Sequence, residues 1–150
     1  NVVGSDKDLI NLKRKCKNLM IGIGFLGNSN KKEILYNKLI NLGFKIPTII
    51  SPLSYVSKFA KIGEGVNIFH NCLIGPDVFI NQGVMINNKC LVEHDVSVDK
   101  FAHISTNCVI NGNSSIGRKS FIGSGTLIKN NSTIKPNSFI KMGSIVIKNK

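Results

Sequence analysis

Residues 74–109 read IGPDVF-INQGVM-INNKCL-VEHDVS-VDKFAH-ISTNCV, six consecutive hexads that each begin with an aliphatic residue. The same column of aliphatic residues runs without a break through Val56, Ile62, Ile68, Ile74, Ile80, Ile86, Val92, Val98, Ile104, Ile110, Ile116, Ile122, Ile128, Ile134, Ile140 and Val146. A small or β-branched residue follows four positions later, from Ala60 to Ser144. A period of six fits neither the 3.6-residue helical turn nor the two-residue alternation of a strand. It is the hexapeptide repeat of a parallel β-helix.

We therefore predict a left-handed parallel β-helix over residues 52–150. Three hexads make one triangular coil in that fold, so residues eighteen apart stack at the strand spacing of about 4.8 Å. The repeat is long enough for about five coils, stabilised mainly by nearest-neighbour contacts. Cys72, Cys90 and Cys108 are eighteen apart and should form one internal ladder of small buried residues. Their spacing lacks the close pairs of a metal site, and unpaired thiols suit a reducing compartment.

Residues 1–51 follow a different pattern, which predicts a partial Rossmann-like α/β domain. The expected elements are a helix over 5–17 capped by Ser5, a strand over 19–23, a helix over 30–42 and a strand over 44–50. Ile34, Leu35 and Leu39 should lie on the inner face of the second helix, which Gly43 should end. Because one and a half α/β units make an incomplete sheet and residue 1 is Asn, we expect an N-terminal truncation.

Gly22-Ile23-Gly24-Phe25-Leu26-Gly27 matches the G-x-G-x-x-G pattern between a predicted strand and a predicted helix. A dinucleotide fold also places an acidic residue about twenty positions further on. Residues 44–50 read FKIPTII and contain none. The motif is therefore interpreted first as a tight strand-to-helix turn, and second as a set of amides for the phosphate of a nucleotide sugar.

The composition narrows the choice of compartment and partner. The formal charge is +12, but no basic cluster interleaved with aromatic residues supports a nucleic-acid site, and a phosphate-bearing small ligand suits the charge equally well. No apolar run is long enough for a membrane span, and the N-terminus does not have the pattern of a signal peptide. We expect a cytoplasmic protein.

Two of the three histidines stand in a chemically suggestive context. His94 is flanked by Glu93 and Asp95, and a neighbouring carboxylate favours the imidazolium form that a general base passes through. Gly112 lies eighteen residues beyond His94, so its amide could stabilise an oxyanion one coil away. His103 is half a coil from His94, so the two should converge across a subunit boundary. The simpler interpretation is two polar corner residues; His70, without an acidic neighbour, is taken as one.

The motifs VEHD at 92–95, FAHIS at 101–105, NGN at 111–113 and FIGSG at 121–125 are similar to those of bacterial sugar O/N-acetyltransferases of the sialic acid and bacillosamine pathways. These enzymes belong to the hexapeptide-repeat transferases, and the resemblance extends over nearly the whole chain. It implies a homotrimer of left-handed β-helices that binds acetyl-CoA between subunits, without a metal, and acetylates a sugar or nucleotide-sugar acceptor.

By the same resemblance, His94 is the general base, Asp95 supports it, and Gly112 lies near the thioester. The remaining residues that the resemblance assigns, all to the coenzyme site, are His103, Ser124 and Met142. Asp95 stands where some members carry Glu, and Met142 stands where a relative has Gly, which narrows the groove.

Two other function classes stay open on this scaffold. One is a metal lyase of the γ-carbonic anhydrase type, which needs three convergent imidazoles, including a pair five residues apart. His94 and His103 are nine apart and do not match. The other is a hexapeptide-repeat scaffold, or an inactive fragment, without catalysis.

Overall fold

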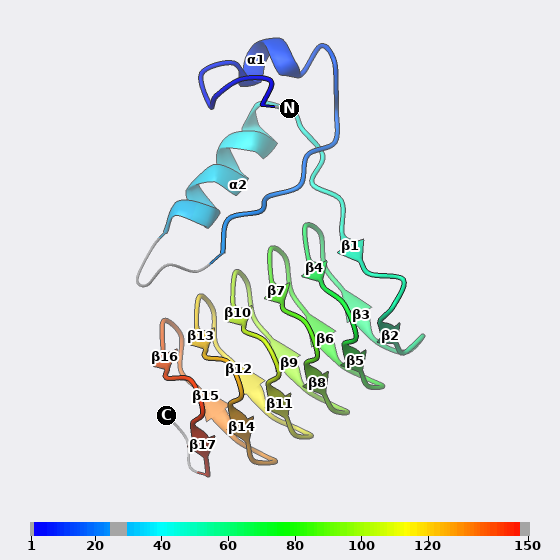
Figure 1. Ribbon diagram of the computed structural model, residues 1–150, viewed down its shortest axis with the longest axis vertical. Helices are drawn as coiled ribbons and strands as arrows, with labels where there is room; N and C mark the ends of the chain where they lie inside the picture. Colours follow the sequence, from blue (N-terminus) through cyan, green and yellow to red (C-terminus); the bar gives the residue numbers. More distant parts are fainter. Residues whose placement is uncertain (1, 25–29, 148–150) are drawn as a thin grey trace.

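The computed structural model describes residues 2–24 and 30–147, and residues 49–147 of it form a parallel β-helix of about five coils (Figure 1). Every strand is two residues long, and its neighbours in the sheet are the strands three places before and after it along the chain, paired in parallel. The strands are β1 Ile49–Ile50, β2 Tyr55–Val56, β3 Lys61–Ile62, β4 Asn67–Ile68, β5 Leu73–Ile74, β6 Phe79–Ile80, β7 Met85–Ile86, β8 Leu91–Val92, β9 Ser97–Val98, β10 His103–Ile104, β11 Val109–Ile110, β12 Ser115–Ile116, β13 Phe121–Ile122, β14 Leu127–Ile128, β15 Thr133–Ile134, β16 Phe139–Ile140 and β17 Ile145–Val146.

The strands stack into three flat sheets, the faces of a prism. Sheet 1 contains β1, β4, β7, β10, β13 and β16; sheet 2 contains β2, β5, β8, β11, β14 and β17; sheet 3 contains β3, β6, β9, β12 and β15. Partners are eighteen residues apart, as in Ile68 with Ile86 and Ile104 with Ile122. The predicted stacking is confirmed, and β1 extends it one hexad before Val56.

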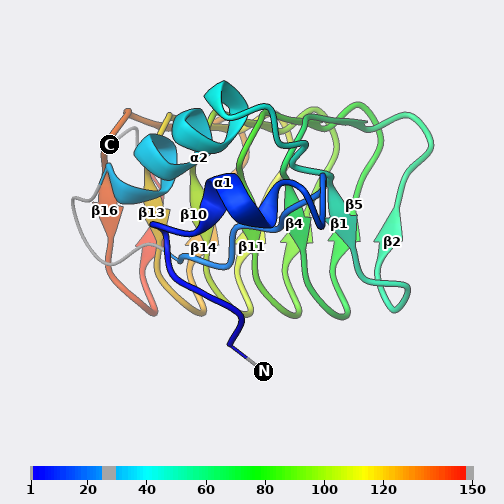
Figure 2. The ribbon, with the colours of Figure 1, turned by 90° about the horizontal axis from the view of Figure 1, so that it is seen from above.

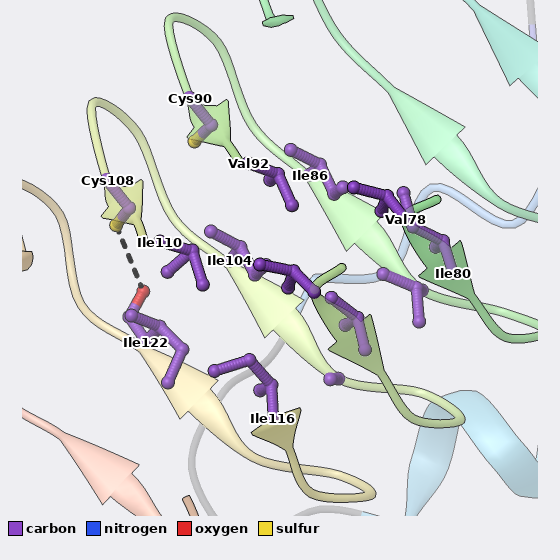
Figure 3. Close-up of a cluster of buried hydrophobic side chains, with 14 of the residues drawn as sticks. Val78, Ile80, Ile86, Cys90, Val92, Ile104, Cys108, Ile110, Ile116 and Ile122 are labelled. Atoms are coloured by element: carbon purple, nitrogen blue, oxygen red, sulfur yellow. Dashed lines mark hydrogen bonds between the residues drawn. The ribbon is translucent and has the colours of Figure 1, made fainter. Parts of the chain in front are cut away.

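The aliphatic column forms the core, as predicted (Figure 3). All its members from Ile68 to Val146 are buried, and Val56 and Ile62 pack against them in part. Each fully buried isoleucine contributes roughly 1.5–3 kcal/mol through loss of apolar surface to water. The ladder of Cys72, Cys90 and Cys108 is buried with free thiols, which confirms its packing role.

The turns between sheets share one backbone requirement. Each corner from Gly65 onward places a residue in the left-handed region, and Asn or Asp occupies most of the non-glycine positions. Short polar side chains tolerate that region better than others do. Asp95 is one of them, with φ 58°, so the position of its carboxylate follows from the turn.

The N-terminal segment differs from the predicted α/β unit in its first helix. Helix α1 is one turn, Leu9–Leu12, instead of a helix over 5–17. Ser5 is not its N-cap, because the amide and hydroxyl of Ser5 both donate to the Asp8 carboxylate, at 2.8 and 3.0 Å. Only Leu9 of this helix is buried, so packing does little to extend it.

Helix α2, Lys31–Asn41, is confirmed within one residue at each end, and Gly43 follows it with φ 79°. Its predicted inner face is partly wrong: Ile34 is 64% exposed, whereas Tyr36 and Leu39 are buried. Tyr36 makes an edge-on contact with Phe101 of the β-helix, which rotates the helix toward that ring.

The predicted strands over 19–23 and 44–50 are reduced, in the described residues, to one parallel bridge between Asn18 and Lys45. Ile49 and Ile50 pair with β4 instead and belong to sheet 1. The N-terminal segment lies along the sheet 1 side of the prism (Figure 2). Glu33 of α2 holds it there through ion pairs with Arg118 and Lys119, the latter at 3.0 Å. Neither described helix has the length and apolar character needed to cross a membrane.

Candidate active site

His94 and Asp95 form a hydrogen-bonded pair on the corner that joins sheet 2 to sheet 3, called here the 2–3 corner (residues 75–78, 93–96, 111–114 and 129–132). Nδ1 of His94 lies 2.8 Å from Oδ2 of Asp95, and both side chains are more than half exposed. An ionised carboxylate only accepts hydrogen bonds, so Nδ1 is the donor and Nε2 keeps its lone pair. The pair presents an accessible nitrogen base to solvent.

Gly112 lies one coil further along the same corner, directly against the imidazole. A Cβ atom at this position would lie 2.6 Å from both Cε1 and Nε2 of His94, so only glycine leaves room for the ring. The amide of Asn113 donates to the His94 carbonyl at 3.0 Å, which ties the two coils together. Within the described part of the chain, the Gly112 amide finds no acceptor. The structure thus brings His94, Asp95 and Gly112 together, as the eighteen-residue spacing predicts.

His103 lies on a different face, as the outward residue of β10 in sheet 1 beneath the N-terminal segment. It is 9% exposed, and Cε1 would lie 3.4 Å from a Cβ at Gly24. Its Nε2 is 3.4 Å from Nδ2 of Asn87. Burial, together with the positive charge of Lys32 on α2, lowers the pKa of His103 to about 4. His103 is therefore a neutral imidazole at physiological pH.

Ser124 and Met142 occupy the corner between sheet 1 and sheet 2, called here the 1–2 corner (residues 69–72, 87–90, 105–108, 123–126 and 141–144). The Ser124 hydroxyl is 2.8 Å from that of Ser105. Met142 is 77% exposed. Both line a surface pocket of about 380 Å³ together with Phe121, Gly123, Phe139 and Lys141.

Within one chain, the predicted site residues therefore fall into two groups. His94, Asp95 and Gly112 lie at one edge of sheet 2, and Ser124 and Met142 at its other edge, with His103 beyond them on sheet 1. Sequence reasoning missed the aromatic and basic lining of the pocket, Phe121, Phe139 and Lys141. The sequence contains a pattern that could have predicted the aromatic lining, because Phe121 and Phe139 are eighteen residues apart at an outward position of the hexad.

The glycine motif and His70 do not form part of either group of predicted site residues. Residues 25–27 of the glycine motif lie outside the described residues; Gly22 and Gly24 lie within them. His70 is a polar corner residue, and its Nδ1 lies at hydrogen-bond distance, 2.6 Å, from the Ser51 hydroxyl oxygen. The described residues contain no cluster of three His, Cys, Asp or Glu side chains that could hold a metal ion.

The chain is similar over its whole length to solved sugar acetyltransferases. A mutant of GDP-perosamine N-acetyltransferase from Caulobacter crescentus, in complex with CoA and GDP-perosamine, is 26% identical with a TM-score of 0.94. The alignment covers 99% of this chain and 70% of that one. The acetyltransferase domain of PglB from Neisseria gonorrhoeae FA1090 is 29% identical with a TM-score of 0.91, covering 99% and 71%. The same domain has been solved in complex with acetyl coenzyme A, at 28% identity.

These neighbours support an acyltransferase of the hexapeptide-repeat superfamily. The resemblance predicted from the VEHD, FAHIS, NGN and FIGSG motifs is confirmed. No protein-family model matches the chain, and no curated protein sequence does so.

Proposed function

We propose that this chain transfers the acetyl group of acetyl-CoA to an amino or hydroxyl group of a sugar precursor of a bacterial surface glycan. The acceptor class is a nucleotide-linked 4-amino sugar or sialic acid, and the compartment is the cytoplasm. The arrangement of His94, Asp95 and Gly112 supports the proposal, because an imidazole that is hydrogen-bonded to a carboxylate lies beside a backbone amide. The solved neighbours that hold CoA with GDP-perosamine support the substrate class.

In the proposed reaction, the protein supplies the imidazole of His94 and the amide of Gly112. The amino nitrogen or hydroxyl oxygen of the acceptor attacks the carbonyl carbon of the thioester. As it attacks, Nε2 of His94 takes the proton from that atom. The Gly112 amide donates to the oxygen that becomes negative in the tetrahedral intermediate, an interaction worth about 3 kcal/mol in comparable oxyanion holes. Collapse of the intermediate breaks the carbon–sulfur bond, and the CoA thiolate takes the proton from the His94 imidazolium, which restores the base. Cys72, Cys90 and Cys108 are buried, so no acyl-cysteine intermediate is part of the scheme.

A homotrimer of left-handed β-helices would complete the site. The outward residues of sheet 2 are an apolar column: Tyr55, Leu73, Leu91, Val109, Leu127 and Ile145. Four of them are 43–69% exposed in the single chain. If three copies turn this face toward a common axis, the 2–3 corner of one copy meets the 1–2 corner of the next. His94 and Gly112 would then approach Ser124 and Met142 of a neighbour.

His103 would contribute to the site between neighbouring copies from the sheet 1 side. Because its ring is neutral, it can donate one hydrogen bond to a thioester or sugar oxygen without adding charge. Lys32 of α2 lies near it, and burial lowers the pKa of Lys32 to about 8. The positive charge that Lys32 retains at neutral pH suits an acceptor that carries phosphates.

The test is an assay of thiol release from acetyl-CoA by the full chain, against a panel of nucleotide-linked 4-amino sugars and sialic acid. His94→Ala should lower turnover by about 10²–10⁴ through loss of the general base, while the affinity for CoA changes little. His70→Ala serves as the matched histidine control. Wild-type turnover by His94→Ala would exclude the imidazole as the base. A trimer that binds no acetyl-CoA at millimolar concentration would favour the scaffold alternative.

A further inference from the structure

The N-terminal segment carries a cluster of positive charges on its outer side. Nine basic and three acidic residues lie within residues 1–50, so this third of the chain contributes half of the formal charge of +12. Figure 1 shows α1 at the outer end of the segment, with α2 between α1 and the β-helix. Six exposed cations, called here the basic surface, follow α1 or lie at the end of α2: Lys13, Arg14, Lys15, Lys17, Lys38 and Lys45.

Two segments of the chain meet in the basic surface. Nζ of Lys13 would lie 2.6 Å from a Cβ atom at Gly43, just beyond the end of α2. The Lys45 amide donates to the Lys17 carbonyl at 2.8 Å. Lys38 belongs to the last turn of α2. The cations that follow α1 therefore lie beside those at the end of α2, and their positive potentials add.

No ion pair joins these cations to a carboxylate within the part of the chain that the structure describes. The Asp8 carboxylate accepts an amide and a hydroxyl hydrogen bond from its own turn. Glu33 forms its ion pairs with the β-helix. The basic surface therefore keeps an uncompensated positive charge, which attracts a surface of negative charge.

Exposed aliphatic side chains near the cations indicate which anionic partner fits. Ile10 of α1 is 67% exposed, and Met20 is 47% exposed. Residues 2–24 contain no aromatic side chain on which a nucleic-acid base could stack. Cations beside exposed aliphatic groups match a bilayer of anionic lipids instead. There the cations pair with phosphates, while the aliphatic groups enter the boundary between headgroups and acyl chains.

We infer that the basic surface binds the face of a bilayer rich in anionic phospholipids, with Ile10 at the headgroup boundary. Clusters of about four to eight Lys and Arg residues suffice for such binding. The inference is independent of the proposed function, because none of the predicted site residues belongs to this surface. It adds to the proposed enzyme a peripheral attachment to a membrane.

The experiment is flotation of the full chain with vesicles. The wild-type chain should float with vesicles of equal parts phosphatidylglycerol and phosphatidylcholine, but not with phosphatidylcholine alone, and added salt should release it. The triple variant Arg14→Gln, Lys15→Gln, Lys17→Gln should lower the partition coefficient about a hundredfold, since each cation near an anionic surface contributes about a factor of five. Ile10→Ser should lower it severalfold through loss of an aliphatic contact.

A second triple variant is the matched control. Lys58→Gln, Lys61→Gln, Lys135→Gln removes the same charge from exposed positions on the β-helix and should float like wild type. Equal losses for the two triple variants would show that net charge acts rather than this surface, and would overturn the inference. Wild-type protein that does not float with anionic vesicles would also overturn it, and binding to an RNA oligonucleotide without flotation would favour nucleic acid instead.

The assay of thiol release keeps this inference distinct from the proposed function. Both triple variants should turn over a water-soluble acceptor at the wild-type rate. A wild-type chain that floats with anionic vesicles but does not transfer acetyl groups would contradict the function and support the inference. An active chain that ignores the vesicles would do the opposite.

Discussion

The imidazole of His94 lies against the Cα atom of Gly112, one coil further along the same corner of the prism. The space for the ring exists only because residue 112 carries no side chain. Stacking by eighteen residues therefore places the imidazole of His94 in contact with the backbone of Gly112, although the two residues are far apart in sequence.

Gly112→Ala should disable the site without unfolding the chain. The new methyl group would lie 2.6 Å from the ring, so the imidazole must move. Misplacement of a reacting group by about 1 Å can cost about 10² in rate, and we expect a loss of kcat/KM of that order. In a His94→Ala background the same change should scarcely alter the thermal midpoint, because the ring is absent. A large loss of stability in that background would show that the methyl group meets the backbone instead.

Asp95→Asn should slow turnover and leave CoA binding unchanged. The carboxylate orients the ring through Nδ1, and an amide at this position can present either a donor or an acceptor. We expect kcat to fall at least about tenfold, measured by thiol release at saturating acetyl-CoA. Asp77→Asn is the matched control, since Asp77 has the same left-handed position one coil earlier, with φ 55°. Equal rates for the two variants would remove Asp95 from the mechanism.

Leu127→Glu should both dissociate the proposed homotrimer and abolish its activity. The substitution places a charge in the apolar column of sheet 2, where Leu127 is 43% exposed in the single chain. Burial of an unpaired carboxylate against a neighbour is costly, so sedimentation should show a smaller particle. Phe79→Glu, on the outward side of sheet 3, should leave the assembly intact. An active Leu127→Glu monomer would contradict a site shared between copies.

Acid should weaken the fold through His103. Burial and the charge of Lys32 lower its folded-state pKa to about 4, against an ordinary value of 6.5. Between these two values the unfolded chain binds the proton and the folded chain does not, so stability falls as pH decreases from 6.5 to 4. The loss is at most about 3 kcal/mol. Urea unfolding of His103→Gln should show a smaller decrease in the free energy of unfolding across this window than wild type. Parallel curves for wild type and His103→Gln would show that the pKa of His103 is the same in the folded and the unfolded chain.

The sequence by itself determined the parallel β-helix, its register and the inward column. Each hexad repeats the same local choice of aliphatic, corner and small residue, so the pattern leaves one consistent stacking. The contact of His94 with Gly112 follows from the same repeat, because residues that are eighteen positions apart stack on neighbouring coils. The pairing of His94 with Asp95 follows from adjacency and the left-handed turn at Asp95.

Tertiary structure alone decided the rest. The first helix shrinks to Leu9–Leu12, since only Leu9 of it is buried. Helix α2 turns Tyr36 rather than Ile34 inward, because its packing partner is the ring of Phe101 on the β-helix. No repeat governs that contact. The burial of His103 likewise depends on where the N-terminal segment lies, and its lowered pKa is a consequence of that packing. The pocket of Phe139, Lys141 and Met142 joins a sheet face to a corner, so it exists only once the coils are stacked in three dimensions.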